Sequence, residues 1–220
     1  MLSVCFSPDG KALCSGSGDS TVRFWDLNSQ LPLHSGEAHK TWVMVVAWSP
    51  DAALVASGDK SGLVHVWDAK TGKTRGACSG HKKWITSIAW EPAHRCLPAK
   101  RFVTASKDKT IAVWSADTRR ATMTMSSHSN TINCVKWGGE GFIFSASSDT
   151  TINVWNADDG RLVRVLKGHA HWINSLALST EHALRTGAFD HTGAAPSDPA
   201  AAQLVRLLAA PRLLSAHSSP

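Results

Sequence analysis

The stretch SASSDTTINVWNADDGRLVRVLKGH, residues 145–169, carries a serine, an aspartate, a tryptophan and a histidine at spacings that return elsewhere in the chain. The recurring tryptophans follow one another at intervals of 42, 47 and 41 residues, at Trp25, Trp67, Trp114 and Trp155. Histidines recur at the same intervals, each 14 residues after a tryptophan, at His39, His81, His128 and His169. A fixed period of about 40 to 45 residues predicts an array of repeated units.

Each unit has the sequence pattern of short strands. The segments that end at the recurring tryptophans are rich in β-branched and aromatic residues, and they read VRFWD (22–26), VHVWD (64–68), IAVWS (111–115) and INVWN (152–156). The segment SPDGK (7–11) has the composition of a turn. The length of a unit allows four strands, so we predict an all-β fold of four-stranded propeller blades.

The period also sets the expected boundaries. We place the blades at about residues 1–38, 39–80, 81–127 and 128–168, with a partial fifth at 169–190 and a tail at 191–220. Pro196 falls where the fifth tryptophan should be, and the tail is dominated by Ala, Pro and Leu, which favours disorder. About four blades and part of a fifth do not close a ring, so we expect an incomplete propeller from a truncated chain or a fragment.

Serine or threonine lies ten residues before each recurring tryptophan, and aspartate lies six before it in three of the four units. With the histidines these positions resemble the WD repeat, which implies a buried hydrogen-bonded chain of Trp, hydroxyl, imidazole and carboxylate. The set is Ser15, Asp19, Trp25, His39, Ser57, Trp67, His81, Thr104, Asp108, Trp114, His128, Ser145, Asp149, Trp155 and His169. In the second unit Ser61 replaces the aspartate and Asp59 lies two positions earlier, so we expect a weaker network there.

A serine, a histidine and an aspartate together also raise the possibility of a hydrolase. Four copies at one period favour a structural role, because an active site is needed only once. Five scattered cysteines form no zinc-finger spacing, and no phosphate-binding loop or metalloprotease motif is present. We therefore predict no catalytic residues, no metal, no cofactor and no small-molecule substrate. No apolar run is long enough to span a bilayer and no signal peptide is apparent, which favours a soluble intracellular protein without a membrane partner.

A third set of tryptophans, three residues after the histidines, has no equivalent in the fourth unit, where Thr131 stands. A core position rarely exchanges Trp for Thr, because truncating a buried aromatic costs about 3–5 kcal/mol. We therefore predict exposed or half-exposed rings that bind a partner, with local core packing as the alternative. In WD repeats, the positions three and five after the histidine and just before the aspartate are exposed contact positions. The resemblance implies a surface of Trp42, Met44, Lys60, Trp84, Thr86, Lys107, Thr131, Asn133, Trp172 and Asn174.

An insertion of about five residues lengthens the third unit at EPAHRCLPAKR, residues 91–101. Its basic residues are His94, Arg95, Lys100 and Arg101. We expect a solvated basic loop, with RNA contact as the alternative.

Several longer segments resemble the Notchless family of ribosome assembly proteins, namely FSPDGKALCSGSGDSTVRFWDLNSQLP (6–32), HKKWITSIAWEP (81–92), WGGEG (137–141) and ALSTEHALRTGAF (177–189). The resemblance implies a non-enzymatic scaffold in large ribosomal subunit biogenesis. It also implies a nuclear, largely nucleolar location and a pre-ribosomal large-subunit particle as partner, through its proteins or rRNA. That family docks on a midasin-type AAA ATPase through an N-terminal ubiquitin-like domain, which these 220 residues do not contain, so we do not assign that contact to this chain.

Two other functions remain open at this point. The first is a WD-repeat adaptor in signalling or in a ubiquitin ligase, whose propeller would have the same periodic residues. The second is a truncated product without independent function.

Overall fold

The computed structural model describes residues 1–93 and 95–178, and in this part of the chain sixteen strands form four antiparallel sheets, or blades. Blade 1 contains β1 (Ser3–Phe6), β2 (Ala12–Gly16), β3 (Val22–Asp26) and β4 (Pro32–Gly36). Blade 2 contains β5 (Val43–Trp48), β6 (Leu54–Asp59), β7 (Val64–Asp68) and β8 (Thr74–Cys78). Blade 3 contains β9 (Ile85–Trp90), β10 (Arg101–Ser106), β11 (Thr110–Ser115) and β12 (Ala121–Ser126). Blade 4 contains β13 (Ile132–Trp137), β14 (Phe142–Ser147), β15 (Ile152–Asn156) and β16 (Leu162–Leu166).

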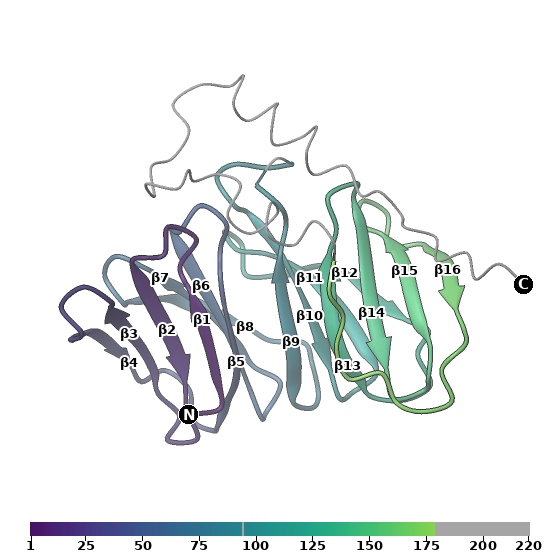
Figure 1. Ribbon diagram of the computed structural model, residues 1–220, viewed down its shortest axis with the longest axis horizontal. Coiled ribbons are helices and arrows are strands. Elements are labelled where there is room, and N and C mark those ends of the chain that lie inside the picture. Colours follow the sequence, from purple (N-terminus) through teal and green to yellow (C-terminus); the bar gives the residue numbers. More distant parts are fainter. Residues whose placement is uncertain (94, 179–220) are drawn as a thin grey trace, which may run out of the picture.

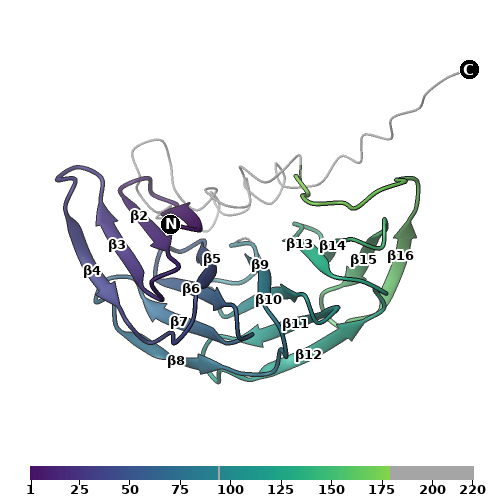
Figure 2. The ribbon, with the colours of Figure 1, turned by 90° about the horizontal axis from the view of Figure 1, so that it is seen from below.

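The four blades are arranged side by side in an open arc (Figure 1). In each blade the strands follow one another in chain order, so the first strand is at one edge and the fourth at the other. The first strands, β1, β5, β9 and β13, lie on the concave side of the arc, and the fourth strands lie on its convex rim (Figure 2). The predicted all-β, incomplete propeller is confirmed for these residues.

The turns between the third and fourth strands of each blade adopt a left-handed backbone conformation. Gly72 and Gly160 have φ angles of 66° and 72° there, which glycine adopts without a Cβ penalty. Gln30 and Arg119 have φ of 59° in the corresponding turns of blades 1 and 3. The same turn therefore forms whether or not glycine is present, which indicates that the flanking strand pairs determine it.

The hydrophobic core lies between adjacent blades. Trp67 of blade 2 packs in one cluster with Val22 and Phe24 of blade 1, and Trp114 of blade 3 packs with Val64 and Val66 of blade 2. Both tryptophans are 1% exposed. Trp67, Trp114 and Trp155 thus each join their own blade to the preceding one, which explains why the tryptophan recurs once per unit.

The two end blades each leave one face uncovered by the described residues. Val4 and Phe6 in β1 are 47% and 51% exposed, whereas the matching Val46 and Trp48 of β5 are 5% and 9% exposed because blade 1 covers them. At the other end every residue of β16 is exposed. The tail at 191–220 and most of the partial fifth blade lie outside the described residues.

No helix in the described part of the chain is long and apolar enough to cross a membrane.

Candidate interaction surface

The periodic polar residues of blade 3 form one continuous chain of hydrogen bonds. Trp114 Nε1 donates to Thr104 Oγ1 at 2.7 Å, Thr104 Oγ1 lies 2.7 Å from His81 Nε2, and His81 Nδ1 lies 2.9 Å from Asp108 Oδ2. An indole can only donate and a carboxylate can only accept, so all protons in the chain point toward Asp108. The imidazole is therefore held with its proton on Nδ1.

Blades 2 and 4 repeat this chain with nearly the same distances. In blade 4, Trp155 Nε1 donates to Ser145 Oγ at 2.8 Å, and His128 lies 2.8 Å from both Ser145 Oγ and Asp149 Oδ2. In blade 2, Trp67 Nε1 donates to Ser57 Oγ at 2.7 Å, and His39 Nε2 lies 2.6 Å from that hydroxyl.

The carboxylate of the blade 2 network is Asp59, which the sequence pattern missed. Its Oδ2 lies 2.9 Å from His39 Nδ1, and its Oδ1 accepts hydrogen bonds from the backbone N–H and the hydroxyl of Ser61. Blades 3 and 4 have serine then aspartate at these two positions, and blade 2 has the reverse order. The network is complete and its carboxylate is more buried than that of Asp108, with 2% against 10% of the side chain exposed. The second network was expected to be weaker because an aspartate was missing, and this premise does not hold, since Asp59 supplies the carboxylate.

Blade 1 and the partial fifth blade show only parts of the pattern. Trp25 Nε1 donates to Ser15 Oγ at 2.9 Å, while the exposed Asp19 accepts from Thr21 in its own turn. His169 is exposed, and the segment that should carry its predicted partners lies outside the described residues.

Hydrogen bonds lower the pKa of two network carboxylates, Asp59 and Asp149, although both are partly buried. Burial opposes ionisation of Asp59, but hydrogen bonds from His39, Ser61 and Leu63 outweigh it and lower the pKa to about 2. For Asp149, hydrogen bonds from Thr151 and His128 likewise outweigh burial and lower the pKa to about 2.

A hydrolase would need its nucleophile to reach a substrate. The three hydroxyls that lie against the Nε2 atom of a network histidine belong to side chains with no solvent exposure, Ser57, Thr104 and Ser145. Each already accepts a hydrogen bond from a buried indole. This arrangement stabilises the blade and leaves no room for a substrate at the hydroxyl. Among residues 1–93 and 95–178, no cluster of His, Cys, Asp and Glu could hold a metal ion.

The tryptophans three residues after the histidines lie at the surface. Trp42 is 48% exposed and Trp172 is 59% exposed, while Trp84 is half-buried. Lys60 N–H donates to the carbonyl of Trp42 at 3.0 Å, and Lys107 N–H donates to that of Trp84 at 2.9 Å. The two predicted contact positions of a blade are therefore neighbours across one strand pair.

The positions five residues after the histidines are mostly used between blades. Thr86 Oγ1 donates to the carbonyl of Ile132 at 2.6 Å, and Asn133 Nδ2 donates to the carbonyl of Ile173 at 2.9 Å. Their polar groups thus join each blade to the next. The other predicted contact residues are half-buried in the case of Met44 and Thr131 and exposed in the case of Asn174.

The basic insertion forms an ion-pair cluster between blades 3 and 4, so the prediction of a solvated loop is wrong for two of its residues. Arg101 makes two hydrogen bonds to the buried Glu91, at 2.8 and 2.6 Å. Arg95 Nη2 lies 3.0 Å from Asp158 Oδ1 in the β15–β16 turn. Lys100 is exposed as expected, and His94 lies outside the described residues.

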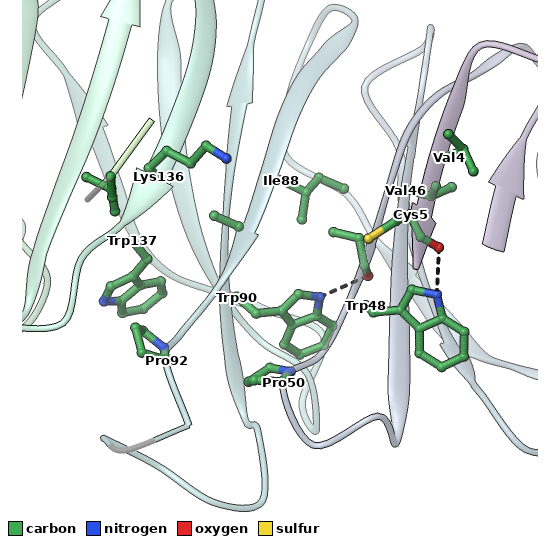
Figure 3. Close-up of a pocket in the computed structure, with 13 residues that line it drawn as sticks. Val4, Cys5, Val46, Trp48, Pro50, Ile88, Trp90, Pro92, Lys136 and Trp137 are labelled. Carbon is green, nitrogen blue, oxygen red and sulfur yellow. Dashed lines mark hydrogen bonds between the residues drawn. The ribbon is translucent and has the colours of Figure 1, made fainter. Parts of the chain in front are cut away.

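A groove of about 250 Å³ opens between the ends of the inner strands (Figure 3). Trp48 Nε1 donates to the carbonyl of Cys5 at 3.1 Å, and Trp90 Nε1 donates to that of Ala47 at 3.0 Å, so each ring links its strand to the preceding blade. Lys136 is the one charged side chain among the described residues that line the groove. The other side chains that line it are aliphatic or aromatic, apart from the Cys5 thiol, and they supply no set of acid and base groups.

Comparison with known proteins gives a consistent result. The family model "WD domain, G-beta repeat" matches residues 1–26, 30–68, 72–115, 119–156 and 160–192. The chain is 54% identical over 146 residues to a Notchless protein homolog from Arabidopsis thaliana, covering 66% of this chain and 31% of the relative. It is 46% identical over 208 residues to Ribosome assembly protein 4 from Saccharomyces cerevisiae, covering 92% of this chain and 40% of the relative. It is 46% identical over 190 residues to Protein Notchless from Drosophila melanogaster, covering 86% and 39%. The chain thus spans between 31% and 40% of the length of these relatives.

Proposed function

The chain belongs to the WD-repeat family and within it to the Notchless group, and from this premise we propose that it acts as a non-enzymatic interaction scaffold in large ribosomal subunit assembly. The relative from Saccharomyces cerevisiae is named Ribosome assembly protein 4, which supports a role in this process. The partner that fits is a pre-ribosomal particle, through its proteins or its rRNA. A location in the nucleus and nucleolus follows from that partner.

One observation carries the scaffold role. The periodic histidines and carboxylates of blades 2, 3 and 4 bond to one another inside the blades, whereas Trp42 and Trp172 are exposed and Trp84 is half-buried at the surface. Large rigid aromatics on a firm scaffold are typical anchors of protein and RNA interfaces. Trp42 and Trp84 come from adjacent blades and Trp172 follows the fourth blade, so the rings are spread over several repeats, which suits a large partner better than a small molecule.

The test is co-sedimentation of the tagged 220-residue chain with precursor large-subunit particles on a sucrose gradient. We expect the double variant Trp42→Ala, Trp84→Ala to lose about tenfold of the particle-bound fraction, because two interface anchors are removed. The matched control is Leu33→Ala, a 49% exposed apolar residue in β4 on the outer rim, which should sediment as the parent does. Unchanged sedimentation of the double variant would refute this surface as the docking site.

Thermal unfolding separates docking from folding. Trp84→Ala should leave the melting midpoint nearly unchanged, since its half-buried ring belongs to none of the hydrophobic core clusters of the described residues. A large loss of stability would show that Trp84 contributes to the core and would contradict its assignment as a contact residue.

A further inference from the structure

Four side chains of the contact surface form one row that alternates tryptophan and lysine. Lys60 Nζ lies 4.4 Å from the ring centre of Trp42 and 4.9 Å from that of Trp84, so it is held between the two rings. Lys107 Nζ lies 3.8 Å from the ring centre of Trp84. We call Trp42, Lys60, Trp84 and Lys107 the tryptophan-lysine row. Blade 2 supplies Trp42 and Lys60, and blade 3 supplies Trp84 and Lys107.

The row is fixed before any partner arrives. Each lysine is bonded through its backbone N–H to the carbonyl of the tryptophan in its own blade, and each ammonium contacts an aromatic ring. A Cβ added at Gly18 would lie 3.9 Å from Trp42, so blade 1 is close to this indole as well. A site whose side chains are already ordered loses less entropy when it binds.

The row carries a surplus of positive charge. The carboxylates next to these lysines in the sequence, Asp59 and Asp108, are turned inward and bonded to His39 and His81. Within the described residues no acidic side chain forms an ion pair with Lys60 or Lys107. Further exposed lysines flank the row, at Lys40, Lys82 and Lys83.

The ammonium groups of Lys60 and Lys107 lie over ring faces of Trp42 and Trp84, and this limits the kind of partner that can bind. An unpaired RNA base would bind by stacking on an open aromatic face, and Lys60 and Lys107 would have to leave before a base could stack on the faces that they cover. The edge of an aromatic ring carries partial positive charge, as the ammonium groups carry full charge. Both features attract carboxylates.

We propose that the tryptophan-lysine row binds an extended acidic segment of a partner protein that has carboxylates at alternate positions. The two ammonium groups lie no more than about 9 Å apart, since both contact Trp84, and alternate side chains of an extended peptide lie about 7 Å apart. Successive carboxylates of such a segment can therefore reach both lysines. In an extended segment the intervening side chains point to the opposite side, away from the row, so the carboxylates make the contact. This inference rests on the proposed function, and it names the partner class of that same surface.

The probe is a fluorescein-labelled octapeptide of alternating glutamate and leucine, titrated with the full chain and followed by fluorescence anisotropy. A second octapeptide has glutamine in place of glutamate, and a third groups the four glutamates at one end. The alternating acidic peptide should bind most tightly, and raising the salt concentration should weaken its binding. Equal binding of the glutamine peptide would overturn the proposal.

The matched variants are Lys60→Met with Lys107→Met against Lys73→Met. Methionine keeps an unbranched apolar stem beside the rings and removes the charge, and Lys73 is an exposed lysine of blade 2 outside the row. We expect the double variant to weaken binding about tenfold and Lys73→Met to change it less than twofold. Equal losses in both would show that only net charge matters and would refute the row as a site.

A decamer of uridylate serves as the competing probe. If it binds more tightly than the acidic peptide and its binding depends on Lys60 and Lys107, the partner is RNA and the proposal is wrong. If the parent chain co-sediments with the particles but does not bind the acidic peptide, this inference is rejected and the proposed function stands. Peptide binding without co-sedimentation would reject the proposed function alone.

Discussion

The exchanged order of Asp59 and Ser61 allows the network of blade 2 to be tested by removing it and then restoring it. Asp59 is 1% exposed, and its carboxylate accepts four hydrogen bonds, from His39 Nδ1, the hydroxyl and N–H of Ser61, and the N–H of Leu63. Removing one partner from a buried charged network costs about 3–5 kcal/mol, because the remaining donors stay buried without an acceptor. We therefore expect Asp59→Ala to lower the free energy of unfolding by about that amount.

Ser61→Ala should cost far less. Its hydroxyl is one of three donors to Asp59 Oδ1, so its loss removes a single hydrogen bond worth about 1 kcal/mol. Asp108→Ala should fall between the two, because the Asp108 side chain is 10% exposed and water can reach part of it. The predicted order of destabilisation is Asp59→Ala, then Asp108→Ala, then Ser61→Ala.

The decisive comparison is Asp59→Ser against the double variant Asp59→Ser, Ser61→Asp. The double variant recreates the order of blades 3 and 4, where serine precedes aspartate by two residues. We expect it to regain most of the stability that Asp59→Ser loses, to within about 1 kcal/mol of the parent. Urea unfolding followed by tryptophan fluorescence measures both midpoints. If the double variant is no more stable than Asp59→Ser, the carboxylate at 59 does not replace the one at 61 and the reasoning fails.

Three further predictions concern stability, each measured by urea unfolding. Burial and the nearby His39 lower the pKa of His65 to about 4, below its unfolded value of about 6.5, so the stability from this group is complete above pH 6.5 and falls as the pH drops toward 4. Between pH 7 and pH 5 this group should lower the free energy of unfolding by about 2 kcal/mol, and His65→Asn should remove that loss. An unchanged dependence of stability on pH in His65→Asn would contradict the assignment. Glu91→Gln should cost about 2–3 kcal/mol at neutral pH, because its buried carboxylate holds the Arg101 guanidinium, and a cost below 0.5 kcal/mol would show that the pair is dispensable. Gly36→Ala should cost about 1–3 kcal/mol, because the added Cβ would clash with the Trp67 ring, while Gly168→Ala, with no atom within 4 Å of its Cβ, should be neutral. Equal midpoints for the two variants would contradict the packing argument.

The repeated residues could be predicted from the sequence because each blade solves the same packing problem. A tryptophan that joins its blade to the previous one and a histidine that ties the entering loop to the blade are needed once per unit, so they recur with the period. The order of Asp59 and Ser61 could not be assigned in this way. Both residues lie in or beside one tight turn, from which either side chain can reach His39, and spacing alone does not choose between them.

Contacts between neighbouring blades were the least predictable part of the site. Arg95 and Asp158 are 63 residues apart and belong to an insertion and a turn that have no common period. Lys60 contacts Trp42 in its own blade, as the repeat suggests, and also Trp84 in the next. Such contacts depend on the angle between two sheets and on side-chain length, which the repeat pattern does not record.

The blade 2 network and the tryptophan-lysine row are joined by the turn that carries Asp59 and Lys60, so substitutions at these two residues should have different effects on stability and on binding. Asp59 Oδ1 accepts the N–H groups of Ser61 and Leu63, and this holds the turn from which Lys60 projects. Asp59→Ala should therefore weaken both unfolding stability and binding of the acidic peptide, because the turn loses its anchor. Lys60→Met should weaken peptide binding alone, since the Lys60 side chain contributes only surface contacts to the blade. The exchange of aspartate and serine around residue 60 leaves the lysine opposite its tryptophan, as in blade 3. The internal network can thus vary between blades while the row keeps its spacing.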